Sequence, residues 1–223
     1  AHSPSRSRQQ PHRRRVGVGR ARQQAVLQEL EDAGSRRKAH RTAGAPFQHG
    51  VSGGAAHDLP AMLTVISGGQ TGPDRAALEA ATATGTPYGG WCPKDGWAED
   101  LPQPPGVLVI YPKLRETPST APEQRTDWNV RDSAALVVLV GQGGLAVSMG
   151  TQRAVRHAES LGKPVAIVDV SKPDAIGQAL AFLTPFVDEP ACIAGPRESE
   201  GPGLQTAARR VLEPVLTEMA SKR

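Results

Sequence analysis

The stretch that decides the fold is L-T-V-I-S-G-G-Q-T-G-P-D-R, at residues 63–75. Its first four residues are apolar or β-branched, which is typical of a short buried strand. Three glycines follow within 67–72, and Pro73 and Asp74 suit the first turn of a helix. A strand, a glycine turn and a helix start in this order direct backbone N–H groups at one point, where they can bind phosphate. Gln70, Thr71 and Arg75 would add side-chain donors, although such a turn can also serve only as a tight corner.

Strand and helix patterns alternate through the rest of 62–223. Nearly continuous apolar strands joined through helices predict a parallel sheet covered on both faces. We therefore expect a doubly wound, mostly parallel, Rossmann-like three-layer α/β/α domain. The expected helices are 73–84 (capped by Gly85), 123–133, 151–161, 171–182 (opened by an S-K-P-D capping box) and 204–220. The expected strands are 63–66, 87–93, 106–111, 135–140, 165–170 and 191–194.

Three glycine-rich loops, at 67–72, 141–150 and 195–203, each follow an expected strand. Ligands of doubly wound sheets bind beyond the carboxyl ends of the strands, where the winding reverses. The three loops should therefore meet on one edge of the sheet. Their convergence is stronger evidence for a binding site than any single loop.

The first 61 residues differ in character from the rest of the chain. They hold 11 basic and 4 acidic residues, whereas 62–223 hold 15 basic and 18 acidic residues. A segment so polar and so poor in aromatics buries too little surface to fold, so 1–61 are expected to be a disordered basic leader. It could be a transit-like or nucleic-acid-binding arm, a linker, or sequence upstream of a true start at Met62, the alternative that we favour. A ligand-binding domain would then span 62–223.

The charge distribution also bears on partners and location. The whole chain carries a net charge of +4, yet the excess of positive charge lies in the leader, so we do not expect the domain to bind nucleic acid. We find no apolar stretch long enough for a signal peptide or a membrane span, which predicts a cytoplasmic protein. Cys92 and Cys192 form neither a zinc nor a redox pattern. Cys192 is expected in a strand, and Cys92 in a loop where it could be exposed.

The expected helix at 123–133 reads E-Q-R-T-D-W-N-V-R-D-S. On a helix Arg125, Asn129 and Asp132 share one face and could present a cation, an amide and a carboxylate together. A solvated face with ion pairs inside the helix is the alternative. The density of polar groups just before the most apolar strand favours a site.

The second and third glycine loops add further candidates. Ser148, Gly150 and Thr151 fall at a helix N-terminus suited to an oxyanion or phosphate, although Thr151 could be only the helix cap. Arg197 lies beside a strand end, where it could contact phosphate with two N–H groups or pair with Glu198 or Asp188.

The segment G-G-W-C-P-K-D-G-W-A-E-D at 89–100 supplies the last candidates. Trp91 could stack on a flat heterocycle, but packing beneath the loop is the interpretation that we favour. Lys94, Glu99 and Asp100 could hydrogen-bond a ring or bind a cation.

Five separated strings resemble one known family. They are S-G-G-Q-T-G-x-D-R-A-A-L (67–78), G-G-W-C-P-K (89–94), A-E-D (98–100), Q-R-T-x-W-N-V-R-D-S (124–133) and A-G-P-R-E-S (194–199). Their order is similar to that of the molybdenum cofactor carrier family, which is also described as a circularly permuted YpsA-like group within the SLOG superfamily of Rossmann-like nucleotide-binding proteins. The resemblance covers 62–223 and none of the leader.

The resemblance implies a homo-oligomer, a dimer or tetramer, that binds the phosphorylated pterin of the molybdenum cofactor (molybdopterin) or a nucleotide. It implies a phosphate cradle of Gly68, Gly69, Gln70, Thr71 and Gly72, completed by Gly150 and Thr151. Family members usually have G-G-T where this chain has Met149-Gly150-Thr151.

Three classes of function remain open at this point. The first is a non-catalytic carrier or binding protein for a phosphorylated heterocycle. The second is an enzyme that cleaves nucleoside monophosphates, by analogy with SLOG relatives that resemble P-G-G-x-G-T-x-x-E. Here Thr151 is followed by Gln152, Arg153 and Ala154, so the glutamate of that motif is missing, and Glu99, Asp100 or Asp132 would have to replace it. A nucleotide-sensing module without turnover is a third alternative.

Overall fold

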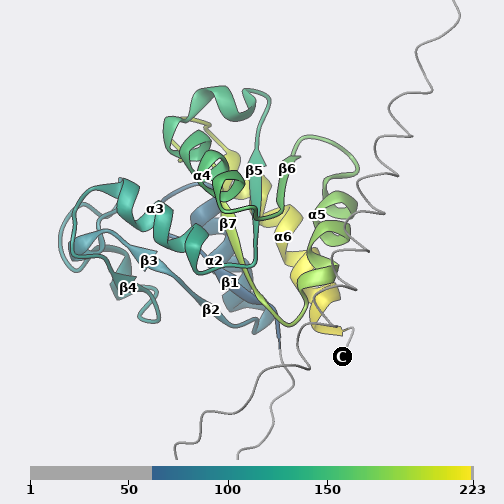
Figure 1. Cartoon of the computed structure of the whole chain (residues 1–223), viewed down its shortest axis with the longest axis horizontal. Helices are drawn as coiled ribbons and strands as arrows, with labels where there is room; N and C mark the ends of the chain where they lie inside the picture. Colours follow the sequence, from purple (N-terminus) through teal and green to yellow (C-terminus); the bar gives the residue numbers. More distant parts are fainter. Residues whose placement is uncertain (1–61, 222–223) are drawn as a thin grey trace, which may run out of the picture. The chain divides into compact units, whose positions relative to one another are not determined.

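The computed structural model describes residues 62–221. The predictions of a disordered leader at 1–61 and of its origin lie outside the described residues. Figure 1 shows a central sheet with helices on both sides. The five strands run in the order β2-β1-β7-β5-β6, and all neighbouring pairs are parallel. The strands are β1 (Thr64–Ile66), β2 (Tyr88–Gly89), β5 (Ala135–Val140), β6 (Val165–Asp169) and β7 (Pro190–Ala194), and the helices are α2 (Pro73–Thr84), α3 (Pro122–Arg131), α4 (Met149–Ser160), α5 (Ala175–Leu183) and α6 (Leu204–Ser221).

The strand β5 shows why the helices form two layers. All six of its residues are buried, and its side chains alternate between the two faces of the sheet. Val137 and Leu139 pack in the cluster that contains α2, α5 and α6, whereas Leu136 and Val138 pack in the cluster that contains α3 and α4. The three-layer α/β/α prediction is confirmed.

The helix after the first glycine loop begins and ends where the sequence predicts. Pro73 is its first residue, and Gly85 closes it in the left-handed conformation, with φ 69°. The same helix packs along α6 on one face of the sheet. This packing brings the N-termini of α2 and α6 close together, because both helices start from neighbouring parallel strands.

The predicted strand at 106–111 is wrong. Residues Gly106–Val109 form a 3₁₀-helix, η2, which begins with a left-handed glycine (φ 55°) packed against the carbonyl of Gly96. Val107 is buried, whereas Val109 and Ile110 are 71% and 50% exposed. A short apolar run fits a strand and a single helical turn equally well, and the glycine decides between them.

Two other boundaries differ from prediction. The segment 87–93 divides between β2 and β3 (Trp91–Cys92), and β3 pairs with β4 (Arg115–Glu116) in a separate two-stranded sheet. The predicted capping box at 171–174 does not form, because the backbone N–H and hydroxyl of Ser171 both donate to Asp169 Oδ1, at 2.9 and 2.7 Å. The helix α5 consequently begins at Ala175.

Both cysteines are buried and free of disulfides. The expectation that Cys92 could be exposed is wrong, because it packs beneath the 106–114 segment with Val107 and Leu114. Burial, helped by the charge of Glu116, raises the pKa of the Cys92 thiol to about 11. Burial likewise raises the pKa of Cys192. Neither thiol is therefore ionised at neutral pH, and reactive thiolate chemistry is not expected of them.

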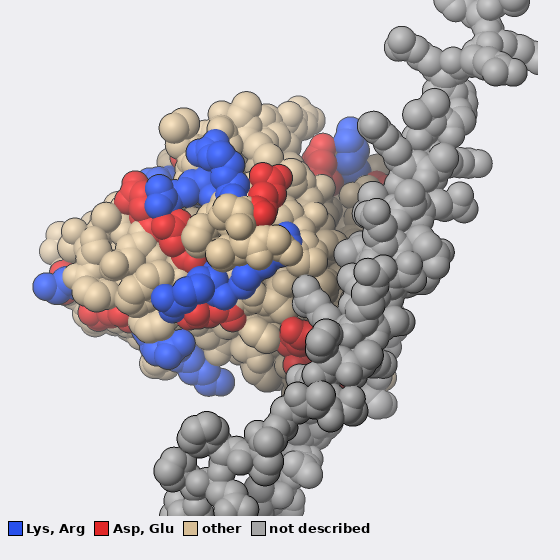
Figure 2. Space-filling view, viewed as in Figure 1, with Lys and Arg blue, Asp and Glu red and all other residues tan. Residues whose placement is uncertain are grey.

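The surface and the helices add two observations about partners. None of the helices within 62–221 is long and apolar enough to cross a bilayer. On the face shown in Figure 2, red patches of Asp and Glu border the blue runs of Lys and Arg.

Candidate functional site

Three adjacent parallel strands bring the glycine loops to one edge of the sheet. The first loop (67–72) follows β1, the second (141–148) follows β5 and the third (195–203) follows β7, which lies between β1 and β5. The helices after β7 and β5 lie on opposite faces. The winding therefore reverses between these two strands, and the loops flank the place where ligands of such sheets bind.

The first and third loops are in direct contact. A Cβ atom on Gly72 would lie 2.3 Å from the carbonyl oxygen of Pro196. The backbone N–H of Glu198 donates to Thr71 Oγ1 at 3.0 Å, and the N–H of Gly72 donates to Gln205 Oε1 at 3.2 Å. The close approach requires glycine at position 72, where φ is 79°.

A buried ion pair lies beneath these loops. Arg125 of α3 donates from Nη1 to Asp74 Oδ2 at 2.6 Å, and the two side chains are only 15% and 3% exposed. Burial raises the pKa of Asp74, and the charge of Arg125 and the N–H groups of Gly195 and Gly68 act against this shift. The guanidinium lies directly on Gly68, because a Cβ there would be 2.2 Å from Nη1.

The predicted side chains Gln70, Thr71 and Arg75 all contact one segment, which we call the carboxylate turn (98–101), and Gln70 does so as an acceptor, not as the donor expected from the sequence. Ala98 and Leu101 close it through paired backbone hydrogen bonds. Arg75 binds both carboxylate oxygens of Asp100, at 3.0 and 2.9 Å, and also donates to the carbonyl of Gly69.

Glu99, the other acidic residue of the turn, binds both glycine loops. Its carboxylate accepts hydrogen bonds from the hydroxyl of Thr71, from the backbone N–H of Ser199 at 3.2 Å and from the hydroxyl of Ser199 at 2.6 Å. Its backbone N–H donates to Gln70 Oε1 at 2.9 Å. Partial burial raises the pKa of Glu99, but the hydrogen bonds from Ser199 and Thr71 and the charge of Arg197 outweigh burial and lower it.

Two backbone groups of the first loop lack a protein acceptor. Within the described residues, the N–H groups of Gly69 and Gln70 donate to no other residue, although both residues are buried. Buried backbone N–H groups normally pair with protein or water. These two donors are therefore unused by the described part of the protein, although they lie beneath its surface.

In the third loop, a carboxylate binds the start of the helix α6 and not a ligand. Glu198 accepts hydrogen bonds from the backbone N–H groups of Gly203 and Gln205 and so caps the start of α6. Arg197 pairs with Glu200, with Nε 3.8 Å from Oε1, rather than with Glu198 or Asp188 as considered from the sequence.

The polar face of α3 supports the loop that carries Trp91. Asn129 accepts from the backbone N–H of Trp91 at 2.7 Å and donates to its carbonyl at 2.9 Å. The indole of Trp91 donates to Asp132 and contacts Trp128 edge-on, with ring centroids 4.7 Å apart. Trp91 is half-buried and packs against α3. Asp132 also binds Arg131, and hydrogen bonds from Arg131 lower its pKa.

The second loop contributes the exposed N-terminus of α4. Ser148 is the cap of this helix, because its Oγ accepts from the backbone N–H of Thr151 at 3.2 Å. Thr151 is buried and donates its hydroxyl to Ser148, whereas Met149 is 76% exposed and Gly150 is also exposed. No hydrogen bond joins these residues to the first loop within 62–221.

Sequence reasoning omitted Ser199, which binds Glu99 and so joins the third loop to the carboxylate turn. Its place two residues after Arg197, in a glycine loop, was the available signal. Lys94, a candidate from the sequence, is exposed in the short 3₁₀-helix η1 (Lys94–Gly96).

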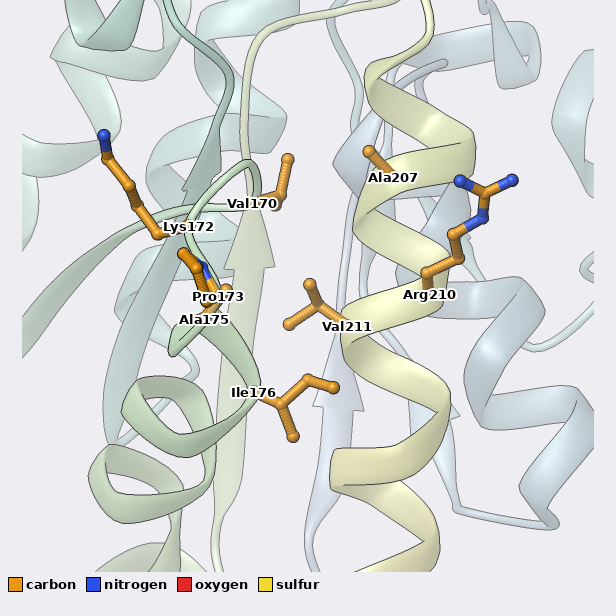
Figure 3. Close-up of a pocket in the computed structure, with 8 residues that line it drawn as sticks. All are labelled: Val170, Lys172, Pro173, Ala175, Ile176, Ala207, Arg210 and Val211. Carbon is orange, nitrogen blue, oxygen red and sulfur yellow. The ribbon is translucent and has the colours of Figure 1, made fainter.

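A separate pocket of about 210 Å³ lies between α5 and α6 (Figure 3). Six of its eight lining residues are apolar, and the basic ends of Lys172 and Arg210 point away from each other in this view. It shares no residue with the loop contacts described above. The lining residues are Val170, Lys172, Pro173, Ala175, Ile176, Ala207, Arg210 and Val211.

Comparison with known proteins identifies the family. The model of the circularly permutated YpsA SLOG family matches residues 65–216. The chain belongs to this family. The match spans β1 to α6, so it includes all three glycine loops and the carboxylate turn of this SLOG protein.

A solved structure supports the same assignment. A protein of known crystal structure, the "Putative molybdenum carrier protein" from Syntrophus aciditrophicus SB, is 33% identical in sequence to this SLOG protein. The alignment covers 70% of this chain and 96% of the other, with a TM-score of 0.60. No curated protein sequence matches the chain.

Proposed function

We propose that this SLOG protein binds and carries a phosphorylated heterocycle, and that the molybdenum cofactor is the first ligand to test. One observation carries the proposal. Two glycine loops already bind an anion, the carboxylate of Glu99, through Thr71 and Ser199. Groups that bind a carboxylate with hydroxyl and N–H donors are chemically suited to a phosphate oxygen.

Two further features support this site. The N–H groups of Gly69 and Gln70 are buried without a protein acceptor, beside the start of α2. Arg125 uses only Nη1 in its pair with Asp74, so its other N–H groups can reach an additional oxygen. The name of the solved relative, a molybdenum carrier protein, directs the choice of ligand. Trp91, Asn129 and Asp132 would support the pterin side of the site, and Ser148, Gly150, Thr151 and Arg197 would line its remaining rim.

Binding is tested with the purified full chain and molybdenum cofactor under anaerobic conditions. We expect a Kd of tens of micromolar or lower and slower oxidation of the bound cofactor. A ligand at a hundred times its Kd should stabilise the fold by roughly 2.7 kcal/mol. Thr71→Val should weaken binding, whereas Thr126→Val should not, because the Thr126 hydroxyl bonds only a carbonyl of its own helix. AMP, another phosphorylated heterocycle, is tested in the same way. If neither molybdenum cofactor nor AMP binds, the proposal is rejected.

The proposal includes a homo-oligomer, a dimer or tetramer. Met149, Val147, Leu161 and Ile167 are large apolar side chains that are between 42% and 76% exposed. Such exposed apolar side chains are typical of association surfaces when they are contiguous. Light scattering during size-exclusion chromatography of the full chain gives its mass, and a monomer would contradict this part.

A further inference from the structure

The carboxylate turn covers the loop that is proposed to hold phosphate. All residues from Gly68 to Gly72 are buried, so a ligand cannot reach the N–H groups of Gly69 and Gln70 unless some covering segment moves. The turn is one covering segment, since its two acidic residues bind Thr71 and Arg75 of the same loop and helix.

The two acidic residues at the tip of the turn make polar contacts, whereas Ala98 at its base is buried, with 1% of its surface exposed. Asp100 is 43% exposed at its side chain although it binds the guanidinium of Arg75 with both oxygens. Glu99 is half-buried and binds through its carboxylate and its backbone N–H. The Arg75 side chain is only 7% exposed, so the turn can leave at modest cost only if another anion takes its place beside the guanidinium.

The turn also has the charge of the proposed ligand. Glu99 and Asp100 supply two carboxylates to Thr71, Ser199 and Arg75, five hydrogen bonds that a phosphate monoester could accept in their place. A bound phosphate beside both carboxylates would be opposed by like-charge repulsion. The turn and a bound phosphate would use the same donors and therefore compete for them.

From these contacts we infer that the carboxylate turn is a built-in competitor of the ligand. Glu99 occupies the position of a phosphate oxygen, and ligand binding displaces the turn from Thr71 and Ser199. This inference rests on the proposed function, because it describes how the same site opens. Glu99 then lowers the affinity of the full chain for phosphate. Without this competition, the same hydrogen-bond donors would bind phosphate more tightly.

In the first test, the folded full chain is titrated with inorganic phosphate, and calorimetry measures the binding. Glu99→Gln replaces charged hydrogen bonds to Thr71 and Ser199 with weaker neutral ones, so the ligand displaces the turn more easily and phosphate binding should tighten about tenfold. The matched control is Glu116→Gln, which removes an exposed carboxylate from β4 and should bind as the natural chain does. Adding Thr71→Val to Glu99→Gln should abolish the gain.

The second test needs no variant and so does not depend on the folding of one. Hydrogen exchange of the natural chain is measured with and without saturating inorganic phosphate. The amides of Glu99 and Leu101, which donate to Gln70 Oε1 and to the carbonyl of Ala98, should exchange faster when phosphate is bound. The amides of Gly69 and Gln70 should exchange more slowly.

The outcomes separate the two proposals. If the natural chain and Glu99→Gln bind phosphate equally, or if the turn keeps its protection while the first loop gains protection, the competitor role is wrong and the binding function stands. If neither form binds phosphate or molybdenum cofactor, the binding function fails and the competitor role fails with it.

Discussion

Asp74→Asn is expected to lower the free energy of unfolding by about 3–5 kcal/mol, because it leaves the charge of Arg125 buried without its partner. The pair lies where α2, α3 and the first and third glycine loops meet, with Asp74 Oδ2 2.6 Å from Arg125 Nη1. Asparagine keeps the size of the side chain and removes only the charge. Urea denaturation at neutral pH measures the change.

A second ion pair in the same protein provides the control. Arg153 and Asp127 also approach to 2.6 Å, but their side chains are 46% and 25% exposed. Asp127→Asn should cost less than about 1 kcal/mol, since solvent screens exposed pairs. Equal losses for the two variants would show that the pair at Asp74 does not hold the loops together.

Gly72→Ala is expected to destabilise the protein by more than about 2 kcal/mol. Strain at a backbone conformation reserved for glycine costs about 1–3 kcal/mol, and a backbone clash adds to it. The new Cβ would lie 2.3 Å from the carbonyl oxygen of Pro196, so the first and third loops would have to separate. Thermal unfolding measures the loss of stability. Ligand binding by the folded fraction measures the effect of separating the two loops.

Gly85→Ala is the matched control for this substitution. Gly85 also has a positive φ, of 69°, but a Cβ there meets no atom within 4 Å. Its cost should be the left-handed penalty alone, roughly 1–2 kcal/mol. If both variants lose the same stability, the contact between the loops contributes nothing beyond the backbone conformation.

The layers of the fold could be predicted from the sequence because apolar runs and helix caps are local signals. The run at 135–140 and the helix bounded by Pro73 and Gly85 needed only residues within one element. The alternation of strands and helices then placed the glycine loops on one edge. The run at 106–111 was ambiguous because four or five apolar residues fit either a strand or a helical turn.

The partners of the loop donors could not be predicted in the same way. Thr71 and Arg75 were recognised as donors, but their acceptors, Glu99 and Asp100, lie more than twenty residues further along the chain. A donor's chemistry is the same whether it binds phosphate or a carboxylate of the protein. Ser199, a hundred residues from Glu99, is joined to it only by the packing of the third loop.

The central claim is that the edge formed by the first and third glycine loops holds the phosphate of the ligand. A crystal structure of the full chain with bound molybdenum cofactor tests it most directly. We predict phosphate oxygens within hydrogen-bond distance of the N–H groups of Gly69 and Gln70, with Glu99 detached from Thr71. Phosphate bound in the pocket between α5 and α6, with Glu99 still on Thr71 and Ser199, would contradict the account.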